Sequence, residues 1–325
     1  MLEYDIVIIG GGPAGLAAGI RAKEEGINKV LILERESCLG GILNQCIHSG
    51  FGVETFEEEL TGPEYAEIFI KKIKEMNIEY KLNTDVFDFN RDKVVLAVNE
   101  EDGILEIKAK AVILATGCRE KPRGAINIAG SKSAGIYTAG TVQKFINLEG
   151  YMPGKEVLIL GSGDIALIIA ERLILEGAKV KAIVEVMDYV EGSEKNLKEC
   201  VYDFNIPLKL SYTVVDIQGN DRVEGVTIAK VDKDRTPIRG TEEFISCDTI
   251  VLSVGLFPDN ELVKRAGIKI SYSTKGPEVN NAMETEIEGV FACGDLLYVH
   301  NLVDKITEEG YRAGGNSADY VKKII

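Results

Sequence analysis

The sequence predicts an α/β fold made of two similar units, each with a parallel sheet. Two observations predict it: an apolar run that ends in a glycine-rich turn opens the chain, and the same pattern returns 151 residues later. The length of 325 residues agrees, since it suits about two domains. Short apolar strands that alternate with helices favour a parallel sheet in each unit.

The first unit begins with the segment Tyr4–Arg35. Its apolar run Ile6–Ile9 is long enough for a buried parallel strand, and the turn that follows has the spacing G-x-G-x-x-G. In such a turn the first glycine bends the chain, the second lets the backbone approach a pyrophosphate, and the third lets helix and strand pack closely. An acid about 20 residues further on can accept a hydrogen bond from a ribose hydroxyl. We therefore expect a dinucleotide to bind at Gly10, Gly12, Pro13, Ala14, Gly15, Glu34 and Arg35.

The second unit repeats this pattern in Lys155–Glu185. Four landmarks of the first unit recur there at one ungapped offset of 151 residues, and Ala166 takes the place of the third glycine, where a small residue is allowed. An acid at the end of the second strand accepts a ribose 2′-hydroxyl and repels a 2′-phosphate, which favours NAD(H) over NADP(H). We expect this second nucleotide to bind at Gly161, Gly163, Asp164, Ile165 and Glu185.

Apolar runs, turn residues and helix-start residues predict the other elements in chain order. Pro63 and Glu64 suit the first turn of a helix, and Glu101-Asp102-Gly103 suits a turn between two strands. Proline, glycine and charged residues mark Arg119–Gly130 and Phe257–Glu261 as connecting segments. Helices are expected at Gly62–Asn77, Ser193–Asp203 and Leu302–Val321, and strands at Lys93–Val98, Ile104–Lys110, Ala111–Gly117, Pro207–Ile228, Arg239–Cys247, Thr249–Gly255 and Gly289–Asp295.

Composition excludes several classes of function. The net charge is −15 and no basic block stands out, which argues against nucleic-acid partners and anionic membrane surfaces. No apolar run approaches the roughly 18 residues of a membrane-spanning helix, and because a strand is predicted to begin near residue 4, we expect no signal peptide. The 6 cysteines are scattered without a C-x-x-C pair, so we expect no metal site, no disulfide framework and a reducing, cytoplasmic location.

With these motifs in place, the chain resembles the two-domain flavoprotein disulfide-reductase superfamily of thioredoxin-reductase size. The segments IIGGGPAG, ILATG, LGSGDIA, LSVG and FACGD carry the resemblance in order along nearly the whole chain. It implies two Rossmann-like domains: an FAD-binding domain formed by residues 1–120 and 257–325, and an NAD(H)-binding domain, residues 121–256, inserted in it.

The same resemblance implies further contacts with the cofactors. Asp295 would bind the ribityl chain of FAD, Val86 would offer its backbone to the adenine, and a helix start at Lys305–Thr307 would lie near the flavin pyrimidine carbonyl. A helix N-terminus there would stabilise negative charge on the reduced flavin. The cofactor-binding residues implied are Gly41, Gln45, Val86, Ala115, Thr116, Gly117, Gly255, Gly294, Asp295, Ile306 and Thr307.

Three segments look similar to a narrower group. Leu39–Gly52, Thr116–Gly124 and Val299–Gly310 resemble the FAD/NAD-binding subunits that accompany anaerobic glycerol-3-phosphate dehydrogenase and the sarcosine-, opine- and proline-oxidising complexes. This resemblance implies a homo- or hetero-oligomer in which the chain exchanges electrons with a partner dehydrogenase or electron-transfer subunit.

The chain departs from the disulfide reductases at their redox-active cysteines. Neither C-x4-C after Gly40-Gly41 nor C-x-x-C in the second unit is present. Cys46 and His48 are the candidate catalytic residues. Two roles remain open for Cys46: a thiol that is redox-active or tunes the flavin, or a small apolar residue that fills space beside it. His48 and His300, the only histidines, could handle protons or serve structure alone.

Three functions follow from these observations. The first is an FAD-dependent NADH oxidoreductase that passes a hydride between NADH and FAD and exchanges electrons with a partner dehydrogenase. The second is a self-contained NADH oxidase or thiol/disulfide reductase that uses Cys46. The third is a non-catalytic, nucleotide-responsive interaction protein in which FAD is only structural.

Overall fold

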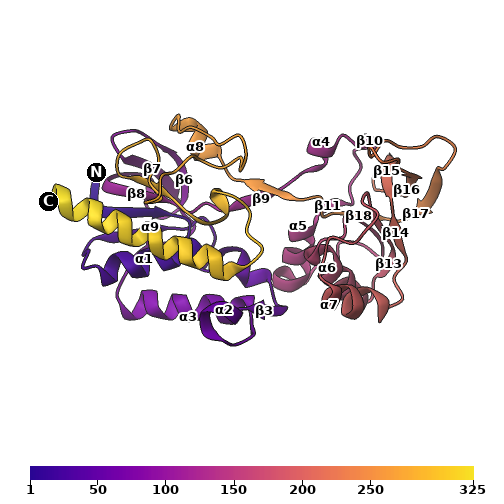
Figure 1. Cartoon of the computed structure of the whole chain (residues 1–325), viewed down its shortest axis with the longest axis horizontal. Coiled ribbons are helices and arrows are strands. Elements are labelled where there is room, and N and C mark those ends of the chain that lie inside the picture. Colours follow the sequence, from indigo (N-terminus) through magenta and orange to yellow (C-terminus); the bar gives the residue numbers. More distant parts are fainter. The chain divides into compact units, whose positions relative to one another are not determined.

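The computed structural model describes all 325 residues of the chain. The chain divides into two compact units. The first is formed by Met1–Arg119 and Phe257–Ile325, and the second by Glu120–Leu256. Two short strands, β9 (Cys118–Glu120) and β19 (Leu256–Pro258), pair with each other where the chain passes from one unit to the other (Figure 1).

The first unit is built on one sheet with the strand order β5-β2-β1-β8-β7-β6, and β20 also pairs with β8. The strands around β1 are parallel, whereas β6, β7 and β8 form an antiparallel meander. The central strands are apolar because both of their faces are covered. The bounds are β1 (Leu2–Ile9), β2 (Val30–Leu33), β5 (Glu79–Lys81), β6 (Asp85–Phe89), β7 (Val94–Asn99), β8 (Gly103–Leu114) and β20 (Val290–Ala292).

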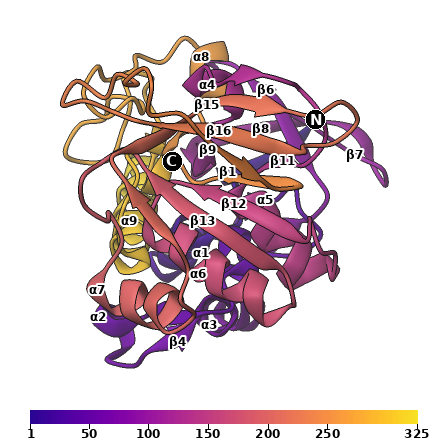
Figure 2. The ribbon, with the colours of Figure 1, turned by 90° about the vertical axis from the view of Figure 1, so that its right-hand side faces the viewer.

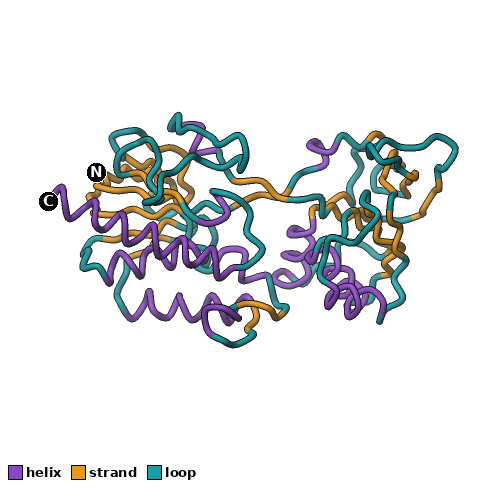
Figure 3. Tube along the Cα trace, in the orientation of Figure 1, coloured by secondary structure: helices purple, strands orange, loops and turns teal.

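Three helices of this unit, α1, α3 and α9, run side by side, with α1 in contact with both others (Figure 3). The α1–α9 crossing is close because its contact residues are small. A Cβ at Gly314 would lie 2.3 Å from the carbonyl oxygen of Ala18. The unit's helices are α1 (Pro13–Glu24), α2 (Val53–Phe56), α3 (Gly62–Glu75), α8 (Glu261–Arg265) and α9 (Val303–Ile324), with 3-10 turns at Gly41–Gln45 and Gly294–Leu296 and a small hairpin of β3 (Ser49–Phe51) and β4 (Leu60–Thr61).

The second unit has a five-stranded sheet of order β11-β18-β12-β13-β14, all of whose pairs are parallel. Alternate residues of β12 face opposite sides: Val157 and Ile159 pack toward the helices, whereas Leu158 and Leu160 pack toward a second sheet, β10-β15-β16-β17. Figure 2 shows α6 on one side of β12 and β13, and β15 and β16 on the other.

The elements of the second unit alternate in sequence as a parallel sheet requires. Its helices are α4 (Arg123–Ile126), α5 (Ala139–Lys144), α6 (Asp164–Leu175) and α7 (Glu194–Asn196), with π-helical turns at Phe145–Glu149 and Leu197–Tyr202. Its strands are β10 (Ala129–Gly130), β11 (Ile136–Thr138), β12 (Glu156–Leu160), β13 (Lys179–Glu185), β14 (Leu208–Leu210), β15 (Tyr212–Gln218), β16 (Gly225–Lys230), β17 (Glu243–Ser246) and β18 (Thr249–Leu252).

The structure differs from the sequence-based expectation in two elements that matter for the site. The two strands expected at Ile104–Lys110 and Ala111–Gly117 are one strand, β8, because its first half pairs with β7 and its second half lies between β1 and β20. The last helix begins at Val303, two residues before Lys305. No helix of the chain is both long enough and apolar enough to span a bilayer.

Candidate cofactor-binding sites

The glycine turn after β1 has the packing that a dinucleotide site requires. A Cβ at Gly10, where φ is +109°, would lie 2.3 Å from the carbonyl oxygen of Ala115, and a Cβ at Gly15 would lie 1.9 Å from the carbonyl oxygen of Gly10. The second glycine, Gly12, is different: a Cβ there would meet nothing closer than the Cα of Gly41, at 4.0 Å. The backbone is therefore open in front of the first turn of α1, where a pyrophosphate would meet free amides.

Glu34, at the end of β2, is held by the backbone. Its carboxylate accepts from the amide of Gly11 at 2.7 Å through Oε2 and from the amide of Glu36 at 2.8 Å through Oε1. The residue is only 5% exposed. A carboxylate has about four lone-pair sites, so each oxygen retains one for a ribose hydroxyl. The fixed rotamer places this acceptor beside the glycine turn.

The second unit repeats this geometry. A Cβ at Gly161 would lie 2.0 Å from the carbonyl oxygen of Ser253, whereas one at Gly163 would meet nothing within 4 Å. Glu185, 3% exposed, accepts from Oγ of Ser162 at 2.7 Å and from the amide of Met187 at 2.8 Å. These two donors stand 151 residues after the two donors to Glu34, so the repeat extends to the hydrogen bonds.

Ser162 is a site residue that sequence reasoning missed. It lies between the first two glycines of the repeat, and its hydroxyl replaces the backbone amide that serves in the first unit. The side chain is fully buried and also accepts from the amide of Glu191 at 3.0 Å. Aligning the two halves of the chain would have placed this polar residue opposite Gly11. Asp164, the first residue of α6, accepts from Ser193 and Asn196 and so ties α7 to the start of the helix.

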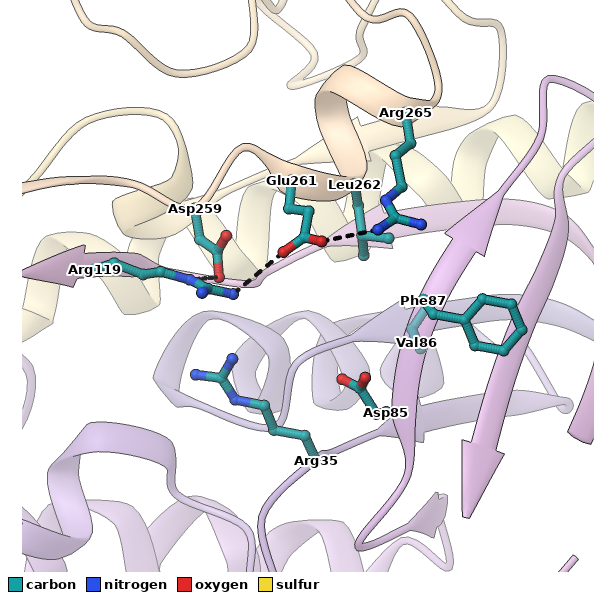
Figure 4. A pocket seen from close by; sticks show the side chains of 9 residues that line it. All are labelled: Arg35, Asp85, Val86, Phe87, Arg119, Asp259, Glu261, Leu262 and Arg265. Carbon is teal, nitrogen blue, oxygen red and sulfur yellow. Dashed lines mark hydrogen bonds and ion pairs between the residues drawn. The ribbon is translucent and has the colours of Figure 1, made fainter. Parts of the chain in front are cut away.

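A cavity of about 230 Å³ lies in the first unit, between the residue after Glu34 and strand β6 (Figure 4). It brings together Arg35, which is expected to contact the dinucleotide, and Val86, whose backbone is expected at the adenine. Arg119 forms an ion pair with Asp259 at 2.7 Å, whereas the guanidinium of Arg35 has no such partner and can stack on a base. The cavity is lined by Arg35, Asp85, Val86, Phe87, Arg119, Asp259, Glu261, Leu262 and Arg265.

β8 is the parallel neighbour of β1, and β20 is the parallel neighbour of β8, so the carboxyl ends of the three strands lie at the same edge of the sheet. A Cβ at Gly294 would lie 2.8 Å from that of Ala14, so the turn that carries Asp295 presses against the start of α1. At the end of β8, Thr116 donates to the carbonyl of Asp259 at 3.3 Å, and Gly117 accepts from the amide of Asp259 at 3.0 Å. Gly255 is the corresponding glycine of the second unit, four residues after Val251 of β18.

The expected helix start at Lys305–Thr307 is shifted. Since α9 begins at Val303, its unbonded amides belong to the residues before Thr307. The side chain of Thr307 is buried and shares a hydrogen bond of 2.8 Å with the hydroxyl of Tyr65. Ile306 and Thr307 therefore lie in the helix body, and the free end of the helix is formed by the residues just before them.

Cys46 lies in the segment after Gly41 and Gln45, and it is only 6% exposed. Its thiol donates to the carbonyl of Ile42 at 3.3 Å, and burial raises the pKa of the Cys46 thiol to about 12. A thiol in this state is a poor nucleophile at neutral pH, because the thiolate is the reactive form. The environment of Cys46 favours the space-filling role over thiol chemistry.

His48 stands at the edge of the same segment. Its Nδ1 lies 3.1 Å from the carbonyl oxygen of Ser49, and its ring lies 5.1 Å from that of Phe51. The other ring nitrogen, Nε2, is buried without a hydrogen-bond partner. No group of histidine, cysteine or carboxylate side chains is arranged to hold a metal ion.

His300, only 3% exposed in its side chain, lies between two carboxylates. Its Nδ1 is 3.0 Å from Oδ1 of Asp295, and its Nε2 is 3.2 Å from Oε1 of Glu309 on α9. Sequence reasoning named His300 as a residue that could handle protons or serve structure alone, but it missed Glu309. The sequence has two adjacent acids, Glu308 and Glu309, and does not show which one faces the protein interior. That depends on how α9 is rotated about its own axis.

Comparisons with known proteins identify the family. A protein-family model described as "Pyridine nucleotide-disulphide oxidoreductase" matches residues 4–312. Thioredoxin reductase of Bacillus subtilis (strain 168) is 28% identical over 90% of this chain and 86% of its own length. A solved structure, thioredoxin reductase of T. acidophilum, has a TM-score of 0.79 at 24% identity, with both chains covered completely.

Two further relatives are longer than this chain. Hydrogen cyanide synthase subunit HcnB of Pseudomonas protegens is 26% identical over 85% of this chain, which spans 61% of that relative. One subunit of the opine oxidase of Rhizobium meliloti is 25% identical over 90% of this chain, which spans 58% of it. The chain thus covers about three fifths of each.

The chain belongs to the pyridine nucleotide-disulphide oxidoreductase family. It is an oxidoreductase and a flavoprotein, and it binds FAD and a pyridine nucleotide. These comparisons confirm the family, the α/β fold and the cofactor class that the sequence motifs implied.

Proposed function

We propose that the chain is an electron-transfer subunit that links NAD(H) to a partner dehydrogenase of the glycerol-3-phosphate dehydrogenase type. FAD would accept a hydride from NADH, or donate one to NAD, and pass electrons to or from the partner. The first unit would hold FAD through the turn Gly10–Gly15, Glu34 and Asp295, and the second would hold NAD(H) through Gly161, Gly163 and Glu185. The openness in front of Gly12 and Gly163 supports this assignment.

The observation that carries the proposal is the state of Cys46. The two disulfide-reductase cysteine motifs are absent from the sequence, and none of the 6 cysteines forms a disulfide. Cys46 is buried, and its raised pKa keeps it protonated. Electrons that reach the flavin therefore have no dithiol to leave by, and a redox centre on another protein is the alternative. HcnB and the opine oxidase relative, by their names, are subunits of larger enzymes.

Glu185 supports NAD(H) as the nucleotide. Its carboxylate is fixed by Ser162 and Met187 and would accept a ribose 2′-hydroxyl, but would repel a 2′-phosphate. The residues directly after it, Val186-Met187-Asp188-Tyr189, contain no cation that could bind a phosphate. We propose that catalytic efficiency with NADH exceeds that with NADPH by more than about tenfold, which is about 1.4 kcal/mol.

The experiment compares electron acceptors for the FAD-loaded protein with NADH as donor. We expect rapid reduction of a one-electron dye such as ferricyanide and negligible turnover of oxygen or of a small disulfide. The Cys46→Ser variant is expected to retain dye reduction, because the thiol takes no part in it. Rapid disulfide turnover by the protein alone, lost in Cys46→Ser, would establish the self-contained thiol reductase instead.

The partner is tested by co-purification from the source cells. NADH-dependent reduction of the co-purified dehydrogenase is expected, together with an assembly larger than one chain. We also propose a cytoplasmic location, since five buried or half-buried cysteines form no disulfide: Cys46, Cys118, Cys200, Cys247 and Cys293.

A further inference from the structure

His300 is hydrogen-bonded to a carboxylate on one side of its ring and lies within ion-pair distance of a second carboxylate on the other. Nδ1 lies 3.0 Å from Oδ1 of Asp295, and Nε2 lies 3.2 Å from Oε1 of Glu309. Ionised carboxylates only accept hydrogen bonds, whereas a neutral imidazole has one nitrogen that donates and one that accepts. In the neutral ring, the nitrogen without a proton would turn its lone pair toward a carboxylate, whereas the doubly protonated ring carries a charge opposite to both acids. The two contacts thus favour an imidazolium between the carboxylates.

We propose that His300 is a positioning residue of the FAD site: as an imidazolium it holds Asp295 in place for a ribityl hydroxyl of FAD and ties it to Glu309 on α9. The inference rests on the proposed role of Asp295 in binding FAD. In addition to that role, His300 and Glu309 would fix the carboxylate of Asp295. The affinity for FAD would then depend on the protonation of His300.

The two oxygens of Asp295 differ in what they bind. Oδ1 accepts from both the ring and the backbone amide of His300, at 3.0 and 2.9 Å. Oδ2 has the thiol of Cys118 at 3.6 Å, and a thiol is a weak donor. Oδ2 therefore keeps acceptor capacity for a hydroxyl, while Oδ1 anchors the side chain to the protein.

Glu309 connects this anchor to the pyrophosphate turn. Its Oε2 accepts from the amide of Gly294 at 2.9 Å, and Gly294 packs against Ala14 at the start of α1. Asp295 contacts His300, His300 contacts Glu309, and Glu309 in turn binds the backbone of the turn that carries Asp295. Removal of the proton would leave two carboxylates facing a neutral ring, with the ion pair to Glu309 lost and the repulsion between the acids unrelieved.

The groups around His300 decide whether its pKa is raised or lowered. Partial burial disfavours the charged ring, but the hydrogen bonds and charges of Asp295 and Glu309 outweigh this and raise the pKa of His300 to about 9. The other titratable or charged groups around the cluster are Tyr298, which stacks on the ring at 4.1 Å between centroids, and Cys118, Cys293, Glu308 and Arg312. The imidazolium therefore persists through neutral pH and is lost as pH rises through about 9.

The test measures release of FAD from the holoenzyme by flavin fluorescence on dilution, between pH 6 and pH 10. For the unmodified protein we expect a constant Kd up to pH 8 and a rise of about tenfold or more by pH 10. His300→Gln should raise the Kd for FAD at pH 7 by a similar factor. In this variant the rise of Kd between pH 8 and pH 10 should be absent. Glu309→Gln should weaken FAD binding, whereas Glu308→Gln, the same change on the adjacent exposed residue, should not.

A second measurement follows the titration of the unmodified protein and uses a variant only to assign the signals. The chain has 2 histidines, so NMR resolves both ring titrations in the unmodified holoenzyme, and His48→Gln assigns them. We expect His300 to titrate at about pH 9 or above, because bound FAD that needs the imidazolium raises the pKa of the ring further. Titration of His300 near 6.5, or a His300→Gln holoenzyme with unchanged Kd and the same pH dependence, would overturn the inference. A protein that binds no FAD at any pH would instead refute the proposed function.

Discussion

Glu185 gives the sharpest test of how the second unit selects its nucleotide. The side chain is 3% exposed, and its two oxygens accept from Ser162 and Met187. Glu185→Gln is the preferred change because glutamine keeps the size and still accepts from Met187. Alanine would leave two buried donors unsatisfied, at about 1–3 kcal/mol each, and would mix a folding defect with the binding effect.

The expected change in nucleotide affinity in Glu185→Gln follows from the loss of a charge-assisted hydrogen bond to the ribose. Such a bond contributes about 1.5–3 kcal/mol, and each 1.4 kcal/mol is tenfold in affinity. Since glutamine retains a neutral contact, we expect the lower end, a rise in Kd for NADH of about tenfold. Kd for NADPH should stay constant or fall, because the repulsion between the carboxylate and the 2′-phosphate is gone.

The assay is titration of the FAD-loaded protein with each nucleotide, followed by flavin reduction without oxygen. Glu224→Gln is the matched control: it removes the same charge from an exposed position in the same unit. The ratio of the two Kd values should change at least about tenfold in Glu185→Gln and remain constant in Glu224→Gln. An unchanged ratio in Glu185→Gln would refute the role of Glu185 in selection.

Three further predictions concern packing, the thiol and pH. Gly314→Ala should destabilise the chain by about 1–3 kcal/mol in chemical unfolding, because a Cβ there meets backbone at 2.3 Å. The neighbouring Gly315→Ala, where a Cβ meets only a side chain at 3.7 Å, should be neutral or stabilising, and equal losses would contradict the packing argument. Cys46 should react with iodoacetamide at pH 8 much more slowly than the exposed Cys38, as mass spectrometry can show, since its pKa is about 12; equal rates would exclude the buried thiol. The stability that the raised pKa of His300 provides is fully present below about 6.5 and lost as pH rises through about 9, so the free energy of unfolding should fall across that window in the unmodified protein more than in His300→Gln.

The parts of the fold that the sequence predicted are those with strong local signals. The glycine turns at Gly10 and Gly161, the strands before them and the acids at Glu34 and Glu185 depend on backbone geometry that few residues can adopt, so spacing alone finds them. The sequence predicts two strands where β8 is one, because the change of its pairing partner on one edge, from β7 to β20, is a tertiary property without a local signal.

The parts that the sequence did not predict are contacts across the fold. Ser162 could have been found, because the internal repeat places it opposite Gly11. Glu309 could not, because its contact with Gly294 depends on the rotation of α9. The state of Cys46 was open for a similar reason: its position in the chain gives no measure of burial, and burial decides whether the thiol ionises.

The most direct test of the central claim is addition of NADH to the purified, FAD-loaded protein without oxygen, with the flavin absorbance followed. We predict that NADH bleaches the flavin, that Cys46→Ser is bleached equally fast, and that the reduced flavin persists until a dye or the partner dehydrogenase is added. A flavin that NADH leaves fully oxidised, or a protein that cannot be loaded with FAD, would contradict the claim.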